Sequence, residues 1–196
     1  MHPMPTAQRR RFLQQSLALG GLGLAAGGLV WPEAAQAQEA GAAGLVMELV
    51  LFRQGSMPPP PVDERNETRP APTFSREQLT PVPAAKLQLA SIAATLRKRA
   101  DYGLIAAGGW WMPAPSNGGG VVAIGDVVTA LPGVGQIGGS LGLQRGTYLT
   151  LSIDVLWAPK ENLQLVMSEK RRVKFNEHHY LDHESFGAIV LVRAPA

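Results

Sequence analysis

The stretch that decides the fold is LTLSIDVLW, residues 149–157. Apolar side chains alternate there with more polar ones, at Leu149, Leu151, Ile153, Val155 and Trp157. Successive side chains of a strand point to opposite faces, so this period of two predicts a strand with one buried face. The same reasoning, applied outward from this stretch, predicts a chain that is mostly β-structure.

Further strand candidates lie on both sides of this stretch. They span residues 45–52, 102–111, 121–129, 137–144, 163–175 and 186–192. The first is continuously apolar, which predicts a strand buried on both faces, and the last predicts a central strand for the same reason. Short turns join sequential candidates, and such turns favour antiparallel pairing.

A loop and a helix separate the first two strand candidates. Residues 55–83 hold eight prolines; proline lacks a backbone N–H, so we expect an extended loop outside any sheet interior. Pro83 suits the first position of a helix. One apolar helical face follows, at Leu89, Ile92, Ala93 and Leu96. We therefore predict an α+β fold, a mostly antiparallel sheet of about six to seven strands with one main helix packed on a face.

The first 37 residues resemble a cleaved signal peptide. Three arginines, residues 9–11, precede an apolar stretch, and Ala35-Gln36-Ala37 matches a signal peptidase site. Residues 9–13 fit a twin-arginine signal, with an ordinary secretory signal as the alternative. We expect one domain, residues 38–196, that lies in the periplasm and has no transmembrane segment after signal removal.

Charge and cysteine content exclude several classes of function. The chain has 18 Lys and Arg against 15 Asp and Glu, and the predicted signal holds three of the bases and one of the acids. The remaining domain is nearly neutral, which gives no electrostatic support for nucleic-acid binding. The chain has no cysteine, which excludes disulfides, thiolate metal sites and cysteine nucleophiles.

A glycine motif at residues 133–138 reads G-x-G-x-x-G. A dinucleotide site needs a helix directly after the glycines, because the phosphates bind at its N-terminus. The residues that follow have strand periodicity instead. We therefore predict no cofactor here.

The densest polar cluster comprises His178, His179, Asp182 and His183. Three such side chains can bind zinc, so an exported metal-binding protein or enzyme is the alternative function for this chain. The segment joins one strand to another, however, and a turn held by histidine and aspartate hydrogen bonds is the commoner arrangement. We predict neither a metal site nor a catalytic site.

A basic run ends the 163–175 candidate. Strand alternation places Lys170, Arg172 and Lys174 on one face and Arg171 on the other. One interpretation is a solvated surface. The other is a docking surface for carboxylates, because arginine offers a planar fork of donors.

Two tryptophans close the 102–111 candidate. A regular strand turns either Trp110 or Trp111 away from the core. An outward ring can stack on a sugar or anchor an interface. The alternative is that both rings cover the end of the sheet.

The C-terminal residues resemble the closing signature of the CsiV family of periplasmic peptidoglycan-binding proteins. That signature pairs two arginines, here Arg171 and Arg172, with a His-Tyr-Leu-Asp-His motif, here residues 179–183, and an apolar strand. Residues 48–52, 96–111 and 139–151 resemble other parts of the family in the same order. The chain departs from the pattern at Thr150, where the family usually has histidine.

The resemblance implies a non-enzymatic protein that binds peptidoglycan and supports its synthesis through periplasmic partner proteins. We expect no cofactor. We expect ligand contacts from Lys170, Arg172 and Lys174, with Trp110 or Trp111 as a stacking residue. We expect a structural corner between two strands, formed by Arg171, His179, Tyr180, Asp182 and His183.

Overall fold

The computed structural model describes residues 44–55, 71–114, 119–161 and 163–194. The predicted signal peptide, residues 1–37, and residues 56–70 of the proline-rich loop lie outside these ranges. No helix within the described ranges is long and apolar enough to cross a membrane.

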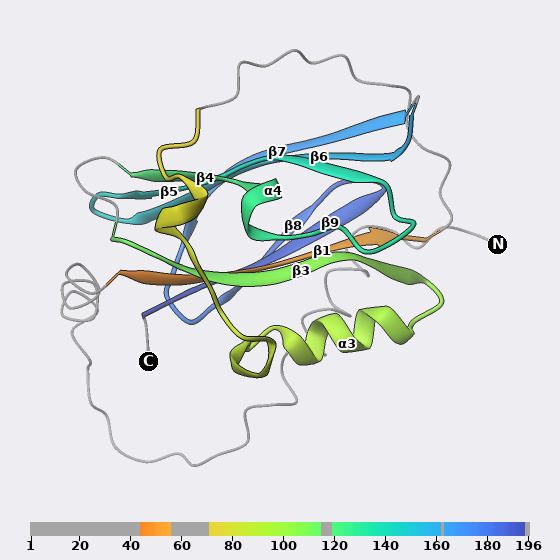
Figure 1. Cartoon of the computed structure of the whole chain (residues 1–196), viewed down its shortest axis with the longest axis horizontal. Coiled ribbons are helices and arrows are strands. Elements are labelled where there is room, and N and C mark those ends of the chain that lie inside the picture. The colour runs from red at the N-terminus through yellow and green to blue at the C-terminus, as the bar shows by residue number, and fades with distance from the viewer. Residues whose placement is uncertain (1–43, 56–70, 115–118, 162, 195–196) are drawn as a thin grey trace. The chain divides into compact units, whose positions relative to one another are not determined.

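Two antiparallel sheets account for the strands of the described residues (Figure 1). The first has the order β2-β3-β1-β9-β8 and the second the order β4-β5-β6-β7. The first sheet comprises β1 (Leu45–Gln54), β2 (Thr80–Pro81), β3 (Tyr102–Met112), β8 (His178–Asp182) and β9 (Phe186–Arg193). The second comprises β4 (Gly120–Ala123), β5 (Gln136–Arg145), β6 (Leu149–Lys160) and β7 (Leu163–Val173). The predicted α+β class is confirmed. The prediction of one sheet of six to seven strands is wrong, because the strands form a five-stranded and a four-stranded sheet.

The main core lies between the two sheets. The alternating apolar residues of β6 belong to it, as their period of two predicts, and so do Met47 and Leu49 of β1. Trp157 of β6 contacts Phe186 of β9 edge to face, with ring centroids 5.7 Å apart. The sheets therefore pack face to face. Alternation along a strand indicates a buried face but not the sheet to which the strand belongs, which is why the sequence did not reveal the division.

The helix α3 (Ala90–Lys98) covers the other face of the five-stranded sheet, beside β3 (Figure 1). Leu89, Ala93 and Leu96 are buried there, as their spacing predicts. β1 is consequently buried on both faces, also as predicted. The predicted start at Pro83 is wrong: a 3-10 turn, η2 (Ala84–Lys86), follows that proline. Leu87 then adopts an extended backbone, which separates the turn from the helix.

Three other segments differ from the expectations. The candidate 121–129 forms only the short strand β4, and α4 (Ile124–Val127) replaces its second half. The proline-rich segment contains a 3-10 turn, η1 (Arg76–Gln78), and β2, an edge strand. An edge tolerates Pro81, because its missing donor would face outward from the sheet. Residues 178–182, expected in a turn, form the edge strand β8, which pairs with β9.

A candidate ligand-binding face

The outward face of the four-stranded sheet is built from small and polar side chains. The core takes Leu151, Ile153 and Val155 of β6, so the residues between them point outward and are half-buried. The register places Thr150 opposite Arg172, and Ser152 opposite Lys170, on the neighbouring strand β7. We call this surface, formed by Tyr148, Thr150, Ser152, Lys170 and Arg172, the basic face.

Tyr148 and Arg172 form a stacked pair on the basic face. The guanidinium carbon of Arg172 lies 3.9 Å from the centroid of the Tyr148 ring. Tyr148 belongs to the turn between β5 and β6 and is 56% exposed. Because Arg172 is opposite Thr150, Tyr148 is its diagonal neighbour, within reach of a long side chain. A positively charged guanidinium over a tyrosine ring is attracted electrostatically by the negative π-face of the ring.

Lys170 and Arg172 of β7, both predicted to contact a ligand, are exposed as neighbours on this face. Within the described part of the chain, neither forms an ion pair with a carboxylate. One row further along the sheet, Asp154 accepts a hydrogen bond from the Ser168 hydroxyl at 2.6 Å. The basic face therefore carries uncompensated positive charge at one end and a carboxylate beyond it.

The structure separates the other predicted contact residues from this pair. β7 ends at Val173, so Lys174 lies beyond the strand, with its ammonium 3.9 Å from a Glu177 carboxylate oxygen. The tryptophans point to opposite faces of β3, as regular alternation requires. Trp110 is 1% exposed inside the main core and cannot meet a ligand at the surface. Trp111 is half-buried on the opposite face of its sheet.

Arg171 links the two sheets at the predicted corner. Its side chain points to the opposite side of β7 from Arg172 and donates a hydrogen bond to the Tyr180 carbonyl at 2.7 Å. Glu169 lies 3.6 Å from the same guanidinium and accepts a hydrogen bond from the Asp182 backbone N–H at 3.3 Å. Residues of β7 thus bind the edge of β8 through side chains rather than through a backbone ladder.

A second polar group lies at the end of β1. Tyr180 donates a hydrogen bond to the Asp182 carboxylate at 2.7 Å. Gln54, which is buried, donates from Nε2 to the same carboxylate at 2.5 Å and to the Tyr180 hydroxyl at 3.0 Å. Burial and the neighbouring Asp182 carboxylate raise the pKa of Tyr180 well above its usual value. The phenol therefore stays protonated as a donor.

The histidines of the signature do not converge on one point. His178 and His179 are consecutive in β8 and point to opposite faces. His179 Nε2 lies 3.1 Å from the backbone nitrogen of Lys174, and His183 Nδ1 accepts a hydrogen bond from the Ser185 N–H. Burial lowers the pKa of both His178 and His183. In the described ranges no three His, Asp or Glu side chains are arranged to hold a metal ion.

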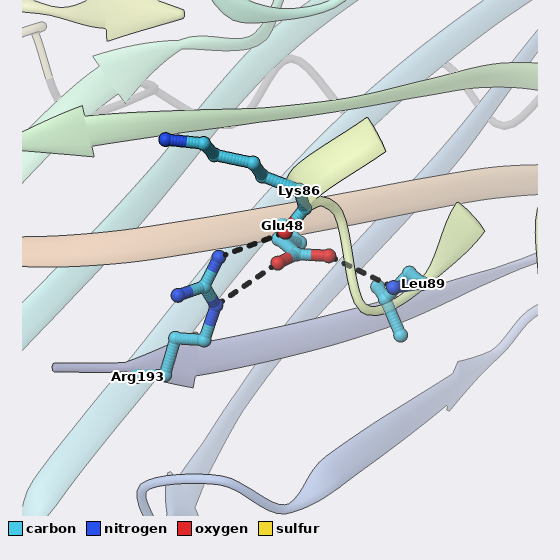
Figure 2. Close-up of polar contacts among 4 residues, drawn as sticks. All are labelled: Glu48, Lys86, Leu89 and Arg193. Carbon is cyan, nitrogen blue, oxygen red and sulfur yellow. Dashed lines mark hydrogen bonds and ion pairs between the residues drawn. The ribbon is translucent and has the colours of Figure 1, made fainter. Parts of the chain in front are cut away.

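Glu48 and Arg193 form a buried contact that sequence reasoning missed (Figure 2). Glu48 is fully buried in β1 and accepts hydrogen bonds from Arg193 Nε at 3.1 Å and from the Leu89 N–H at 2.9 Å. Arg193 also donates to the Lys86 carbonyl at 3.2 Å. The signal was a single carboxylate within the apolar run 45–52, which requires a buried partner.

Tyr148 and Gln54 were also missed as contact residues. Each lies far along the chain from its partners, and no periodic pattern marks either of them. Strand register alone brings Tyr148 beside Arg172 and Gln54 beside Asp182.

Comparison with known proteins identifies the family. The family described as "Peptidoglycan-binding protein, CsiV" matches residues 31–195, which is most of the chain. No curated protein and no solved structure gives a significant match. The match includes the arginine pair, β8 and β9, where the closing signature lies. The chain belongs to the CsiV family of peptidoglycan-binding proteins.

Proposed function

We propose that this chain is a non-enzymatic periplasmic protein that binds peptidoglycan through its basic face. One observation carries the proposal: Lys170 and Arg172 are exposed on an open sheet face, beside the exposed ring of Tyr148 and without a carboxylate partner in the described residues. Peptidoglycan carries carboxylates on its stem peptides, and the family is named for binding it. Charge complementarity and family membership therefore support the same ligand.

The remaining expected residues have secondary places in this proposal. Lys174 has a lesser role, because it lies past the end of β7 with its ammonium 3.9 Å from a Glu177 carboxylate oxygen. Trp111 offers a half-buried ring on the five-stranded sheet. Trp110 takes no part, because it is enclosed by the core. Cell-wall synthesis proteins in the periplasm are the proposed partners, and residues 1–37 are the proposed export signal, of twin-arginine type.

Co-sedimentation of the purified protein with insoluble peptidoglycan, across a series of salt concentrations, tests the proposal. We expect retention at low salt that decreases as salt rises, because exposed charges are screened beyond about 10 Å at 0.1 M ionic strength. Arg172→Ala is expected to reduce retention. Arg97→Ala is the matched control, since it removes the same charge from an exposed position on α3. Equal loss in both variants, or no retention of the unmodified protein, contradicts the proposal.

A further inference from the structure

The stacked pair of Tyr148 and Arg172 restricts how the arginine can meet a ligand. The guanidinium carbon lies over the Tyr148 ring, 3.9 Å from its centroid. At this distance a guanidinium nitrogen directed at the ring would clash with it, so the group must lie with one face against the ring. The N–H donors of a guanidinium lie in its plane and point away from its faces. Stacking therefore leaves the donors available while it limits the rotation of a long side chain.

A guanidinium held in this way is suited to a carboxylate. Its paired N–H groups match the two oxygens of a carboxylate, and less conformational entropy is lost when the fork is already oriented. Lys170 is two residues away on the same face, a separation of about 7 Å along a strand. It adds a second positive charge without competing for the same oxygens.

The surroundings favour an anion over a sugar. An aromatic residue binds a sugar through its ring face, but one face of Tyr148 already contacts Arg172. Thr150 and Ser152, opposite the two cations, are short and leave the basic face open. Asp154, one row beyond Lys170, would repel a carboxylate and so limits the site on that side.

We infer that Arg172, oriented by Tyr148 and assisted by Lys170, is a carboxylate subsite for the stem peptides of peptidoglycan, and that the glycan strand is not its ligand. This inference rests on the proposed function, because it specifies which part of peptidoglycan the basic face binds. Tyr148 acts as a positioning residue, since it orients the arginine.

The test compares two preparations of the same peptidoglycan in the co-sedimentation assay. In one, the carboxylates are converted to neutral methylamides by carbodiimide and methylamine; the other is treated with methylamine alone. We expect the purified protein to lose about tenfold or more of its affinity on the amidated material, the effect of one lost charge-assisted contact. Equal affinity for the two preparations overturns the inference, while retention on both would still support peptidoglycan binding, the broader part of the proposed function. No binding to either preparation overturns both.

Three variants distinguish carboxylate binding by the oriented guanidinium of Arg172 from general attraction to its positive charge. Arg172→Lys keeps the charge but loses the fork, and we expect about a tenfold loss of affinity for the mock-treated material. Tyr148→Ala should cause a loss of several-fold, whereas Tyr148→Phe, which keeps the ring, should bind normally. These positions are exposed, and circular dichroism with thermal unfolding checks that the variants fold. Normal binding by Arg172→Lys, or equal binding by Tyr148→Ala and Tyr148→Phe, overturns the assignment.

Discussion

Glu48 and Arg193 join β1 and β9, the first and last strands of the described residues, by a buried ion pair, with Arg193 Nε 3.1 Å from Glu48 Oε1. The same carboxylate accepts the Leu89 N–H immediately before α3. Gly109, opposite Glu48 on β3, has no side chain, which leaves room for Glu48 and for Leu87. One buried carboxylate thus anchors the segment leading into the helix to the sheet.

Removal of either charge from this pair should destabilise the fold. Glu48→Gln keeps an oxygen for the Leu89 N–H but leaves the Arg193 charge buried without a counter-charge, which costs about 3–5 kcal/mol. Arg193→Met should cost a similar amount, and the double variant less than the sum of the two. Urea unfolding at equilibrium measures all three. Additive costs would show that the two side chains are not energetically coupled.

Loss of the Asp182 side chain should lower stability, whereas loss of the Arg172 side chain should weaken peptidoglycan binding. Asp182→Ala leaves the Tyr180 hydroxyl without its acceptor and removes the shortest hydrogen bond of Gln54, which keeps the His183 and Phe186 carbonyls. We expect a cost of about 1–3 kcal/mol in the free energy of unfolding. Arg172→Ala, at an exposed position, should change that free energy by less than about 0.5 kcal/mol. Thermal unfolding and peptidoglycan co-sedimentation of both variants check this. If both variants simply unfold, the assignment of Asp182 to the structural corner and of Arg172 to ligand contact is wrong.

The histidine at the β8–β9 turn makes stability depend on pH in the weakly acidic range. Burial lowers the pKa of His183 below its ordinary value of about 6.5, so the unfolded chain binds a proton that the folded protein resists. The contribution of the neutral His183 to the free energy of unfolding is then fully present above about pH 7, and it is lost as pH falls below about 6.5 towards the pKa of the folded protein. His178 acts in the same direction.

Thermal unfolding midpoints between pH 5 and 8 (roughly the range in which histidine titrates) measure this dependence. His183→Asn keeps an acceptor near the Ser185 N–H and should flatten the profile. Titration of the imidazole protons by NMR is the independent check. A pKa for His183 at or above the ordinary value would contradict the prediction.

Gly187 should not tolerate a side chain. A Cβ there would lie 2.7 Å from Cζ of the fully buried Phe52 and 3.2 Å from the Leu181 carbonyl oxygen. We expect Gly187→Ala to cost about 1–3 kcal/mol by overpacking. Gly138→Ala is the matched control, a strand glycine whose Cβ would meet nothing within 4 Å. Urea unfolding should show no loss for the control, and equal losses would mean that crowding at Phe52 is not the cause.

Much of the fold followed from local patterns. The run 45–52, the alternation 149–157 and the run 186–192 each predicted a strand, and β1, β6 and β9 confirm them. Residues 178–182 were harder, because polar side chains dominate there and the strand has only one apolar residue in the core, Leu181. Pairing with β9 makes this segment a strand, and pairing is not a local property.

The candidate site divides in the same way. Alternation along β7 is enough to place Arg172 and Arg171 on opposite faces, and the closing signature is enough to indicate the family. The contact between Arg172 and Tyr148 depends on the register of β6 against β7, and a shift of one residue would place Tyr148 elsewhere.

Local sequence therefore specified which residues form most strands, which faces they bury and which family the chain belongs to. Those properties depend on periodicity and on short motifs, which neighbouring residues carry. Tertiary structure alone decided the division into two sheets, the burial of Trp110, the Glu48–Arg193 ion pair and the stacking of Arg172 on Tyr148. Each of these requires residues distant in the chain to meet, and it is the packing of two sheets around one core that brings them together.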